Sequence, residues 1–296
     1  MFDACLPSIR IFPSRASICA VARGYKSAAS TSALVEHSQH RTPQPLFAES
    51  SCLLPSSTVR CDLIIPALNE ATNISDLFDA IRSLPDGLVR HVILADNGST
   101  DGTPQAAQAR GAIVVHEPKR GYGAACLKAL EWIELQHEAP EVVAFLDADL
   151  SDDPAVLPAL LQPIARNEAD IVIGSRVKLA EPGALNAAQR WGGRLACIMI
   201  AILARKRYTD LGPFRAVRWT TFQRLAMADR TWGWTVELQM KAALMNIPTI
   251  EIDVPYRRRA AGRSKISGTL RGLVTAGSKI ITTIIAIRCQ HRRSRT

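Results

Sequence analysis

The stretch "EVVAFLDADLSDDP", residues 141–154, joins an apolar run to four carboxylates within seven positions. The run lacks any alternation of polar and apolar residues, which is typical of a strand buried on both faces of a sheet. Asp147, Asp149, Asp152 and Asp153 follow directly. Carboxylates this close repel one another unless a cation lies between them. The stretch therefore predicts a buried parallel strand with a cation-binding loop at its end.

Outward from this stretch, strand-like and helix-like segments alternate. Short apolar runs occur at 61–66, 91–96, 112–117, 141–147 and 169–175, and helical spacing occurs at 73–84, 103–111, 123–135 and 154–167. This alternation predicts a Rossmann-like α/β fold, a mainly parallel sheet with helices on both faces. We expect Asn73 with Asp76 to cap the first helix, and Thr103 to cap the second.

Three polar loops come at the ends of predicted strands: "PALNE" at 66–70, "ADNGSTDGT" at 95–103 and "DADLSDDP" at 147–154. In parallel α/β sheets, ligands bind at the carboxyl ends of the strands. We therefore expect the three loops to share one edge and to form the functional site.

Asp147 and Asp149 are separated by one residue, so both can reach this edge. Carboxylate oxygens suit Mg²⁺ or Mn²⁺, and such ions are usually held by one or two carboxylates together with substrate phosphates. Asp152 and Asp153 precede Pro154, and there they are more typical of a helix cap and a first-turn charge.

Glycines and cations elsewhere suggest phosphate binding. In "KRGYGAA", Gly121 and Gly123 would let the backbone approach a ligand, and Arg120 offers a fork to phosphate or base. "YRRRAAGRSK", residues 256–265, suits a loop that folds over a diphosphate, although a solvated surface is the alternative. The chain has no Gly-x-Gly-x-x-Gly and no Walker loop, which disfavours dinucleotide enzymes and phosphate-loop NTPases.

The net charge of +9 belongs to one end of the chain. From residue 254 onward there are 11 Lys and Arg and no Asp or Glu, against 25 basic and 27 acidic side chains before it. A local basic segment favours nucleotide or anionic lipid as partner. Nucleic acid is disfavoured because no aromatic residues are interleaved with the charges. Seven scattered cysteines without a Cys-x-x-Cys pair are typical of a reducing compartment such as the cytoplasm.

The two ends of the chain differ from the middle. Residues 1–58 are rich in Ser, Ala and Pro, which predicts a disordered extension; their basic residues resemble an organellar targeting peptide, and an unstructured tail or overlong start is the alternative. Residues 194–204 are apolar all round but too short to span a membrane, so a buried or interfacial helix is expected. Residues 266–296 predict an amphipathic helix with a basic tail, lying either on a membrane surface or against protein.

The ordered motifs "CDLIIPALNEATNISDL", "VILADNGSTDGT", "KRGYGAACLKAL", "FLDADLSDDP", "IVIGSR", "DLGPFRAVRW", "WGWTVELQMKA" and "YRRRAAGRSKISGT" span about residues 60–270. Together they resemble the family 2 glycosyltransferases with the GT-A fold, and most of all the dolichol-phosphate mannosyltransferase-like branch. The resemblance implies a glycosyltransferase domain over 59–265, followed by the amphipathic helix.

The resemblance also implies roles for individual residues. Asp147 and Asp149 would hold the metal, with Asp149 the better ligand, and Arg259 and Lys265 would cover the donor phosphates. The acceptor side would hold Arg215, Trp234 and Glu237. The nucleotide sugar would contact Pro66, Leu68, Glu70, Asp96, Asn97, Arg120, Asp147 and Ala148. The family usually has Asp where this chain has Asn97, and the lipid-phosphate enzymes often have Gln where it has Ser151.

The resulting hypothesis is a hexosyltransferase that uses Mg²⁺ or Mn²⁺. It would move a hexose from GDP-mannose or UDP-glucose to a polyprenyl or dolichyl phosphate, as a peripheral membrane protein held by its C-terminal helix. One alternative is a soluble acceptor such as phosphoglycerate or a glycan. Others are a nucleotidyltransferase, disfavoured because no Gly-rich loop opens the core, and a nucleotide-sugar-binding protein without activity.

Overall fold

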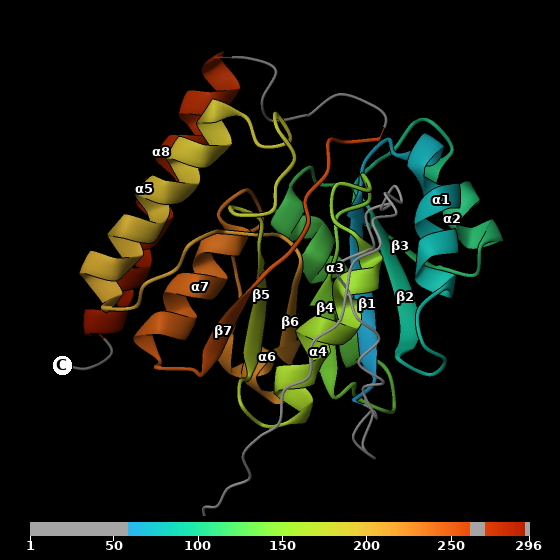
Figure 1. The fold of residues 1–296 in the computed structure, drawn as a ribbon, viewed down its shortest axis with the longest axis horizontal. Coiled ribbons are helices and arrows are strands. Elements are labelled where there is room, and N and C mark those ends of the chain that lie inside the picture. Colours follow the sequence, from blue (N-terminus) through green and yellow to red (C-terminus); the bar gives the residue numbers. More distant parts are fainter. Residues whose placement is uncertain (1–58, 261–269, 294–296) are drawn as a thin grey trace, which may run out of the picture. The chain divides into compact units, whose positions relative to one another are not determined.

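The computed structural model describes residues 59–260 and 270–293, with 270–276 described by their backbone alone. All of them belong to one compact unit, Leu53–Thr296. Its centre is a seven-stranded sheet in the order β3-β2-β1-β4-β6-β5-β7 (Figure 1). The strands are β1 Cys61–Ala67, β2 Val89–Asp96, β3 Ile113–His116, β4 Val142–Phe145, β5 Ile171–Ser175, β6 Arg215–Arg218 and β7 Thr249–Asp253. Only β6 runs antiparallel to its neighbours among these strands, so the predicted mainly parallel α/β sheet is confirmed.

Helices cover both faces of the sheet. They are α1 Ala71–Arg82, α2 Thr103–Ala109, α3 Tyr122–Glu134, α4 Leu157–Ala165, α5 Ala187–Ala204, α6 Trp219–Leu225, α7 Trp234–Leu244 and α8 Leu270–Arg293, with a short 3₁₀ turn, Pro154–Val156, before α4. Strand β1 explains why there are two cores: Leu63 and Ile65 pack with α1 and α4, whereas Ile64 packs with α3 and α7. A continuous apolar run is therefore buried on both sides, as its composition predicted.

The helix caps differ in part from the prediction. Helix α1 begins at Ala71, and the Asn73 amide donates to the Glu70 carboxylate at 2.8 Å instead of capping the helix. The Thr103 hydroxyl accepts the backbone N–H of Glu70 at 2.8 Å, because α1 and α2 start side by side at the same edge. Asp153 does act as a cap, since its carboxylate accepts the N–H of Ala155 at 3.0 Å.

The sequence did not predict how the elements after β5 pack together. Helices α5, α7 and α8 pack against one another, and α7 also covers one face of the sheet (Figure 1). Helix α8 buries Ile284 and Ile287 in the same core as α3 and α7. Within the described residues, no helix has the length and apolar content that crossing a bilayer requires. The division of the chain at 58/59 and 265/266 stays a prediction.

Candidate active site

The three polar loops meet at one edge of the sheet. The parallel strands β2, β1 and β4 lie next to one another, so their carboxyl ends are adjacent. Hydrogen bonds join the loops: the N–H of Asn97 donates to the Ala67 carbonyl at 2.9 Å, and the N–H of Thr100 donates to the Asn69 side chain at 2.7 Å. The edge therefore gathers the polar ends of three strands into one place.

Asp147 and Asp149 follow the end of β4, where Asp147 is half-buried and Asp149 is buried. The Tyr122 hydroxyl donates to Asp147 Oδ1 at 3.0 Å, and the N–H of Ser151 donates to Asp149 Oδ1 at 2.9 Å. Burial, and next the charge of Asp149, raise the pKa of Asp147 to about 6. The pair is thus an unfavourable concentration of negative charge that favours a bound cation.

Arg259 supplies a cation to this edge. Its Nη1 lies 2.6 Å from Glu70 Oε1 in the first loop, and its Nη2 lies 2.8 Å from Asp149 Oδ2 in the third. The backbone around it is fixed, because the N–H of Arg257 donates to the Ser151 carbonyl at 2.8 Å. A guanidinium fork therefore bridges the loops after β1 and β4. Lys265, its predicted companion, lies outside the described residues.

The residues present fit a divalent ion that is bound together with a substrate. Asp147 and Asp149 offer hard oxygen ligands from a single loop. In the described ranges, no three His, Cys, Asp or Glu side chains come together as a metal-binding group. Two carboxylates with the remaining positions left to phosphate and water match the way Mg²⁺ is usually held beside nucleotides.

The loop after Asp149 is strained and holds an unusual carboxylate. Leu150 has a φ of 60°, which for a residue with a side chain costs about 1–2 kcal/mol. Asp152 is 1% exposed, and neither of its oxygens has a hydrogen-bond partner in the described part of the chain. Burial, and next Asp147, raise the pKa of Asp152 well above its ordinary value. Such strain is typical of binding sites.

Among the residues predicted to bind the nucleotide sugar, Asp96 and Asn97 form hydrogen bonds to the backbone of nearby loops. Asp96 accepts the N–H groups of Gly98 and Ser99, and Asn97 bonds to the loop 117–121 through both ends of its amide. Arg120 is exposed and donates to the Gly98 carbonyl at 3.2 Å. Pro66 and Leu68 are partly exposed at the end of β1, whereas Ala148 is buried between the two aspartates. Nucleotide binding by these residues stays a prediction.

Gly121 and Gly123 are needed for a contact within the protein, which was not predicted. The N–H of Gly123 donates to the Thr231 carbonyl at 3.2 Å, and the N–H of Ala124 donates to the Arg230 carbonyl at 2.9 Å. A Cβ at Gly121 would overlap the Arg230 carbonyl oxygen, and one at Gly123 would overlap that of Asp229. In this structure the backbone of 229–231 occupies the start of α3, and the approach of a ligand to these glycines stays a prediction.

The predicted acceptor-side residues are all buried. Arg215 is 0% exposed and donates to backbone carbonyls, including that of Gly212. Trp234 packs on Phe145, and the Glu237 carboxylate accepts the N–H groups of Ala228 and Asp229. Of the three, Glu237 supports the loop 226–233 from inside, whereas Arg215 and Trp234 pack within the core. Their contact with an acceptor stays a prediction.

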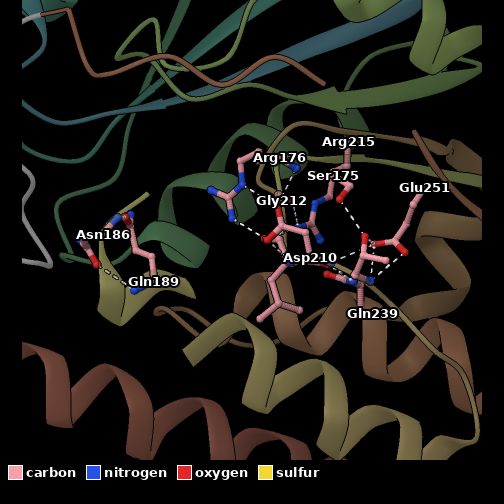
Figure 2. A network of polar contacts seen from close by, with 11 residues as sticks. Ser175, Arg176, Asn186, Gln189, Asp210, Gly212, Arg215, Gln239 and Glu251 are labelled. Atoms are coloured by element: carbon pink, nitrogen blue, oxygen red, sulfur yellow. Dashed lines mark hydrogen bonds and ion pairs between the residues drawn. The ribbon is translucent and has the colours of Figure 1, made fainter. Parts of the chain in front are cut away.

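Sequence reasoning missed a second polar network beside the site. Figure 2 shows Asp210 facing Arg176, with its carboxylate 2.7 Å from Arg176 Nε. Glu251 of β7 accepts the N–H of Asp210 at 3.1 Å, and Gln239 of α7 donates to the Asp210 carbonyl at 2.9 Å. The Arg176 guanidinium also lies 5.0 Å from the centre of the Tyr256 ring. The motifs "GSR" and "DLG" were the available signal, but they do not indicate that the two pair.

Comparisons with known proteins agree with this arrangement. The model of the family "Glycosyl transferase family 2" matches residues 62–218. An uncharacterized glycosyltransferase of Mycobacterium tuberculosis is 34% identical over 218 residues, covering 72% of this chain and 93% of that protein. The undecaprenyl-phosphate mannosyltransferase of Micrococcus luteus is 28% identical over 226 residues, covering 71% and 88%.

Among solved structures, the chain is similar to glucosyl-3-phosphoglycerate synthase from Mycobacterium tuberculosis in complex with Mn²⁺, UDP and phosphoglyceric acid. The TM-score is 0.60 at 23% identity, covering 78% of each chain. This likeness concerns the fold and matches the predicted GT-A architecture. The family match extends from β1 through β6 and includes the loops after β1, β2 and β4 that form the site. The chain belongs to glycosyltransferase family 2 and is a glycosyltransferase.

Proposed function

We propose that this glycosyltransferase moves a hexose from a nucleotide diphosphate sugar to a polyprenyl or dolichyl phosphate. One observation carries the proposal: the Arg259 guanidinium bridges Glu70 and Asp149, next to the half-buried Asp147. Positive and negative groups that face each other across adjacent loops are suited to a diphosphate and its counter-ion. Mg²⁺ or Mn²⁺ held by Asp147 and Asp149 would supply charge neutralisation for that diphosphate.

The protein's own residues would do three things. Arg259 would turn from the carboxylates to the diphosphate and stabilise the charge that develops on the leaving nucleotide. Tyr122 would hold Asp147 in place through its hydroxyl. The loop 226–233, which is bonded to the start of α3, would shield the acceptor side from water. A phosphate acceptor is already ionised near neutral pH, so alignment rather than proton removal would be the main task.

Two observations bear on the acceptor. The similarity to an undecaprenyl-phosphate mannosyltransferase extends over 71% of this chain, which favours a lipid phosphate. The similarity to glucosyl-3-phosphoglycerate synthase of Mycolicibacterium smegmatis is 34% over 140 residues and covers 44% of the chain. Together with the structural likeness, the latter supports phosphoglycerate as the second candidate acceptor.

The test is a transfer assay with a matched pair of variants. Purified protein with Mn²⁺ is given radiolabelled GDP-mannose or UDP-glucose and either a polyprenyl phosphate or phosphoglycerate. We expect label to move into the organic phase with the lipid acceptor. Asp149→Asn should abolish transfer, whereas Asp153→Asn, in the same loop but capping the turn before α4, should retain it.

Three outcomes would contradict the proposal. Label that remains in water with phosphoglycerate alone assigns the soluble acceptor. Full turnover by Asp149→Asn refutes the metal assignment. A protein that fails to bind any GDP or UDP sugar with Mn²⁺ present, measured by thermal shift, has lost the activity of its family.

A further inference from the structure

Helix α5 carries a stripe of exposed apolar side chains. Trp191 is 71% exposed, Leu195 49%, Ile198 47% and Ile202 72%. They recur every three or four residues over the 18-residue helix, so they lie on one face. Isolated exposed apolar residues are ordinary, but a contiguous row on one helix marks a surface that binds something. We call these four residues the α5 stripe.

The α5 stripe is separate from the face that α5 uses inside the protein. Ala196, Cys197 and Ile200, on the opposite side of the helix, are buried in the core shared with α7 and α8. The apolar segment 194–204 thus has two faces in the structure. One packs in the core, and the other is exposed to solvent.

Helix α8 uses part of its apolar face inside the protein. Its Ile284 is 0% exposed and Ile287 is 8% exposed, because both pack into the core. Over residues 277–293, where its side chains are described, the one large apolar residue in the exposed class is Ile285, at 48%. In the part of α8 whose side chains are described, protein therefore covers Ile284 and Ile287, and membrane contact by this helix stays a prediction. Helix α5 packs beside α8 (Figure 1). Its stripe exposes four large apolar side chains, against one in the described part of α8.

The charge around the α5 stripe indicates which kind of partner this surface binds. Residues 182–209 contain five Lys and Arg and no Asp or Glu, and α8 contains no acidic residue either. Arg190, Arg194 and Arg205 are exposed, and Arg194 is three or four residues from Trp191 and Ile198, so it borders the stripe. A second copy of the same surface would bring like charges together. An anionic lipid surface would receive both the apolar side chains and the arginines.

We propose that the α5 stripe and its arginines dock this protein on the surface of an anionic bilayer. Trp191, Leu195, Ile198 and Ile202 enter the interfacial layer, and the arginines contact lipid phosphates. The inference rests on the proposed function in one respect: docking would bring the acceptor side to a lipid phosphate. Lys279 of α8 lies 3.0 Å from Asp229 Oδ2, and Asp229 belongs to the loop that is bonded to the start of α3. Helix α8, which packs against α5, thus connects the helix that carries the docking face to the loop 226–233.

The experiment is vesicle co-sedimentation of the full chain, without donor or acceptor. Vesicles of phosphatidylcholine with phosphatidylglycerol are compared with phosphatidylcholine alone. We expect binding to the anionic vesicles that weakens about tenfold or more in about 0.5 M salt. Ile202→Glu should lower the binding by about tenfold, because it places a carboxylate in the interfacial layer. Leu135→Glu is the matched control, since Leu135 follows α3 and is 77% exposed, and its binding should equal that of the unchanged protein.

Several outcomes would overturn the inference. Equal binding to both vesicle types would contradict the proposed docking face. Equal binding by Ile202→Glu and Leu135→Glu would contradict it too. If the unchanged protein ignores vesicles and light scattering shows a dimer that Ile202→Glu converts to a monomer, the stripe is an interface between copies. Circular dichroism checks that each variant is folded. Vesicle binding without hexose transfer contradicts the proposed function alone, and transfer to a short water-soluble prenyl phosphate without vesicle binding contradicts the docking alone.

Discussion

At the scale of single residues, Asp147 makes the metal-free protein less stable near neutral pH. Its pKa is 3.8 in an unfolded chain and about 6 in the fold, because of burial and then Asp149. The fold therefore binds this proton more tightly. The resulting stability is complete below about pH 4 and is lost as the pH rises through about 6.

Asp147→Asn should consequently stabilise the metal-free protein. We expect its free energy of unfolding to rise by about 1–3 kcal/mol at about pH 7.5 and to change little at about pH 4. The same variant should lose hexose transfer, because it removes one of the two proposed metal ligands. Urea denaturation at both pH values checks the first part. A variant that is less stable than the unchanged protein at about pH 7.5 would contradict the repulsion between the two carboxylates.

Arg259 should compete with a metal ion for Asp149. Its Nη2 contacts Asp149 Oδ2 in the structure, so Arg259→Ala frees that oxygen. We expect this variant to bind Mn²⁺ more tightly in the absence of nucleotide, measured by titration calorimetry. Its rate of transfer should nevertheless fall by about 10²–10³, the usual cost of removing one donor to a developing charge.

The neighbouring Arg258 is the control for Arg259. It bonds to the Pro182 carbonyl and to Glu181, away from the acidic pair. Arg258→Ala should leave both Mn²⁺ affinity and transfer near those of the unchanged protein. Equal effects of the two substitutions would show that the basic segment acts only through its total charge.

The residue scale also shows how far sequence reasoning reached. Asp147 and Asp149 could be selected from a local pattern, because two aspartates at the end of a strand suggest a metal and phosphate. The basic segment 256–265 was a local signal as a whole, but only the family resemblance singled out Arg259 within it. The contact between Arg259 and Glu70 joins residues 189 positions apart, which a local pattern cannot predict. The burial of Arg215 and Glu237 was equally invisible, because charged residues are usually exposed.

At the scale of elements, the start of α3 is fixed by another part of the chain. Gly123→Ala would place a Cβ against the Asp229 carbonyl, so we expect the free energy of unfolding to fall by about 1–3 kcal/mol. Transfer should fall too, because Tyr122, which holds Asp147, is the first residue of this helix. Thermal denaturation and the transfer assay check the two effects.

Gly192→Ala in α5 is the matched substitution. A Cβ at Gly192 meets nothing within 4 Å, and Gly192 lies inside a helix. We therefore expect stability to rise by about 0.5–1 kcal/mol, from helix propensity alone. If both glycine variants are equally stable, the close approach at α3 does not constrain the fold.

The elements that sequence predicted best were those in the alternating half. From β1 to β5, apolar runs and helical spacing gave each element within a few residues. Strand β6 was missed because "RAVR" has two charged ends in four residues, and its antiparallel pairing between β4 and β5 is decided by contacts with both. Helix α8 was predicted, but whether protein or lipid covers its apolar face depends on α5 and α7, which sequence spacing does not place.

At the scale of the whole molecule, Asp210 joins parts of the chain that are distant in sequence. Its carboxylate pairs with Arg176 after β5, and its backbone bonds to Gln239 of α7 and Glu251 of β7 (Figure 2). Burial alone would raise the pKa of Asp210, but hydrogen bonds and charge from Arg176 outweigh it and lower the pKa. The ionised carboxylate therefore stabilises the fold above about pH 4, and this contribution is lost as the pH falls through the lowered pKa.

Asp210→Asn should leave Arg176 buried without its counter-charge. We expect the variant to lose about 3–5 kcal/mol of stability at about pH 7, the usual cost of breaking a buried ion pair from one side. Because the unchanged protein loses the same contribution in acid, the difference should shrink below about pH 4. Asp79→Asn is the control, since Asp79 pairs with Arg110 with 57% of its side chain exposed, and its effect should be small throughout. Urea denaturation at several pH values checks this, and a difference that stays constant into acid would show that Asp210 acts by shape and not by charge.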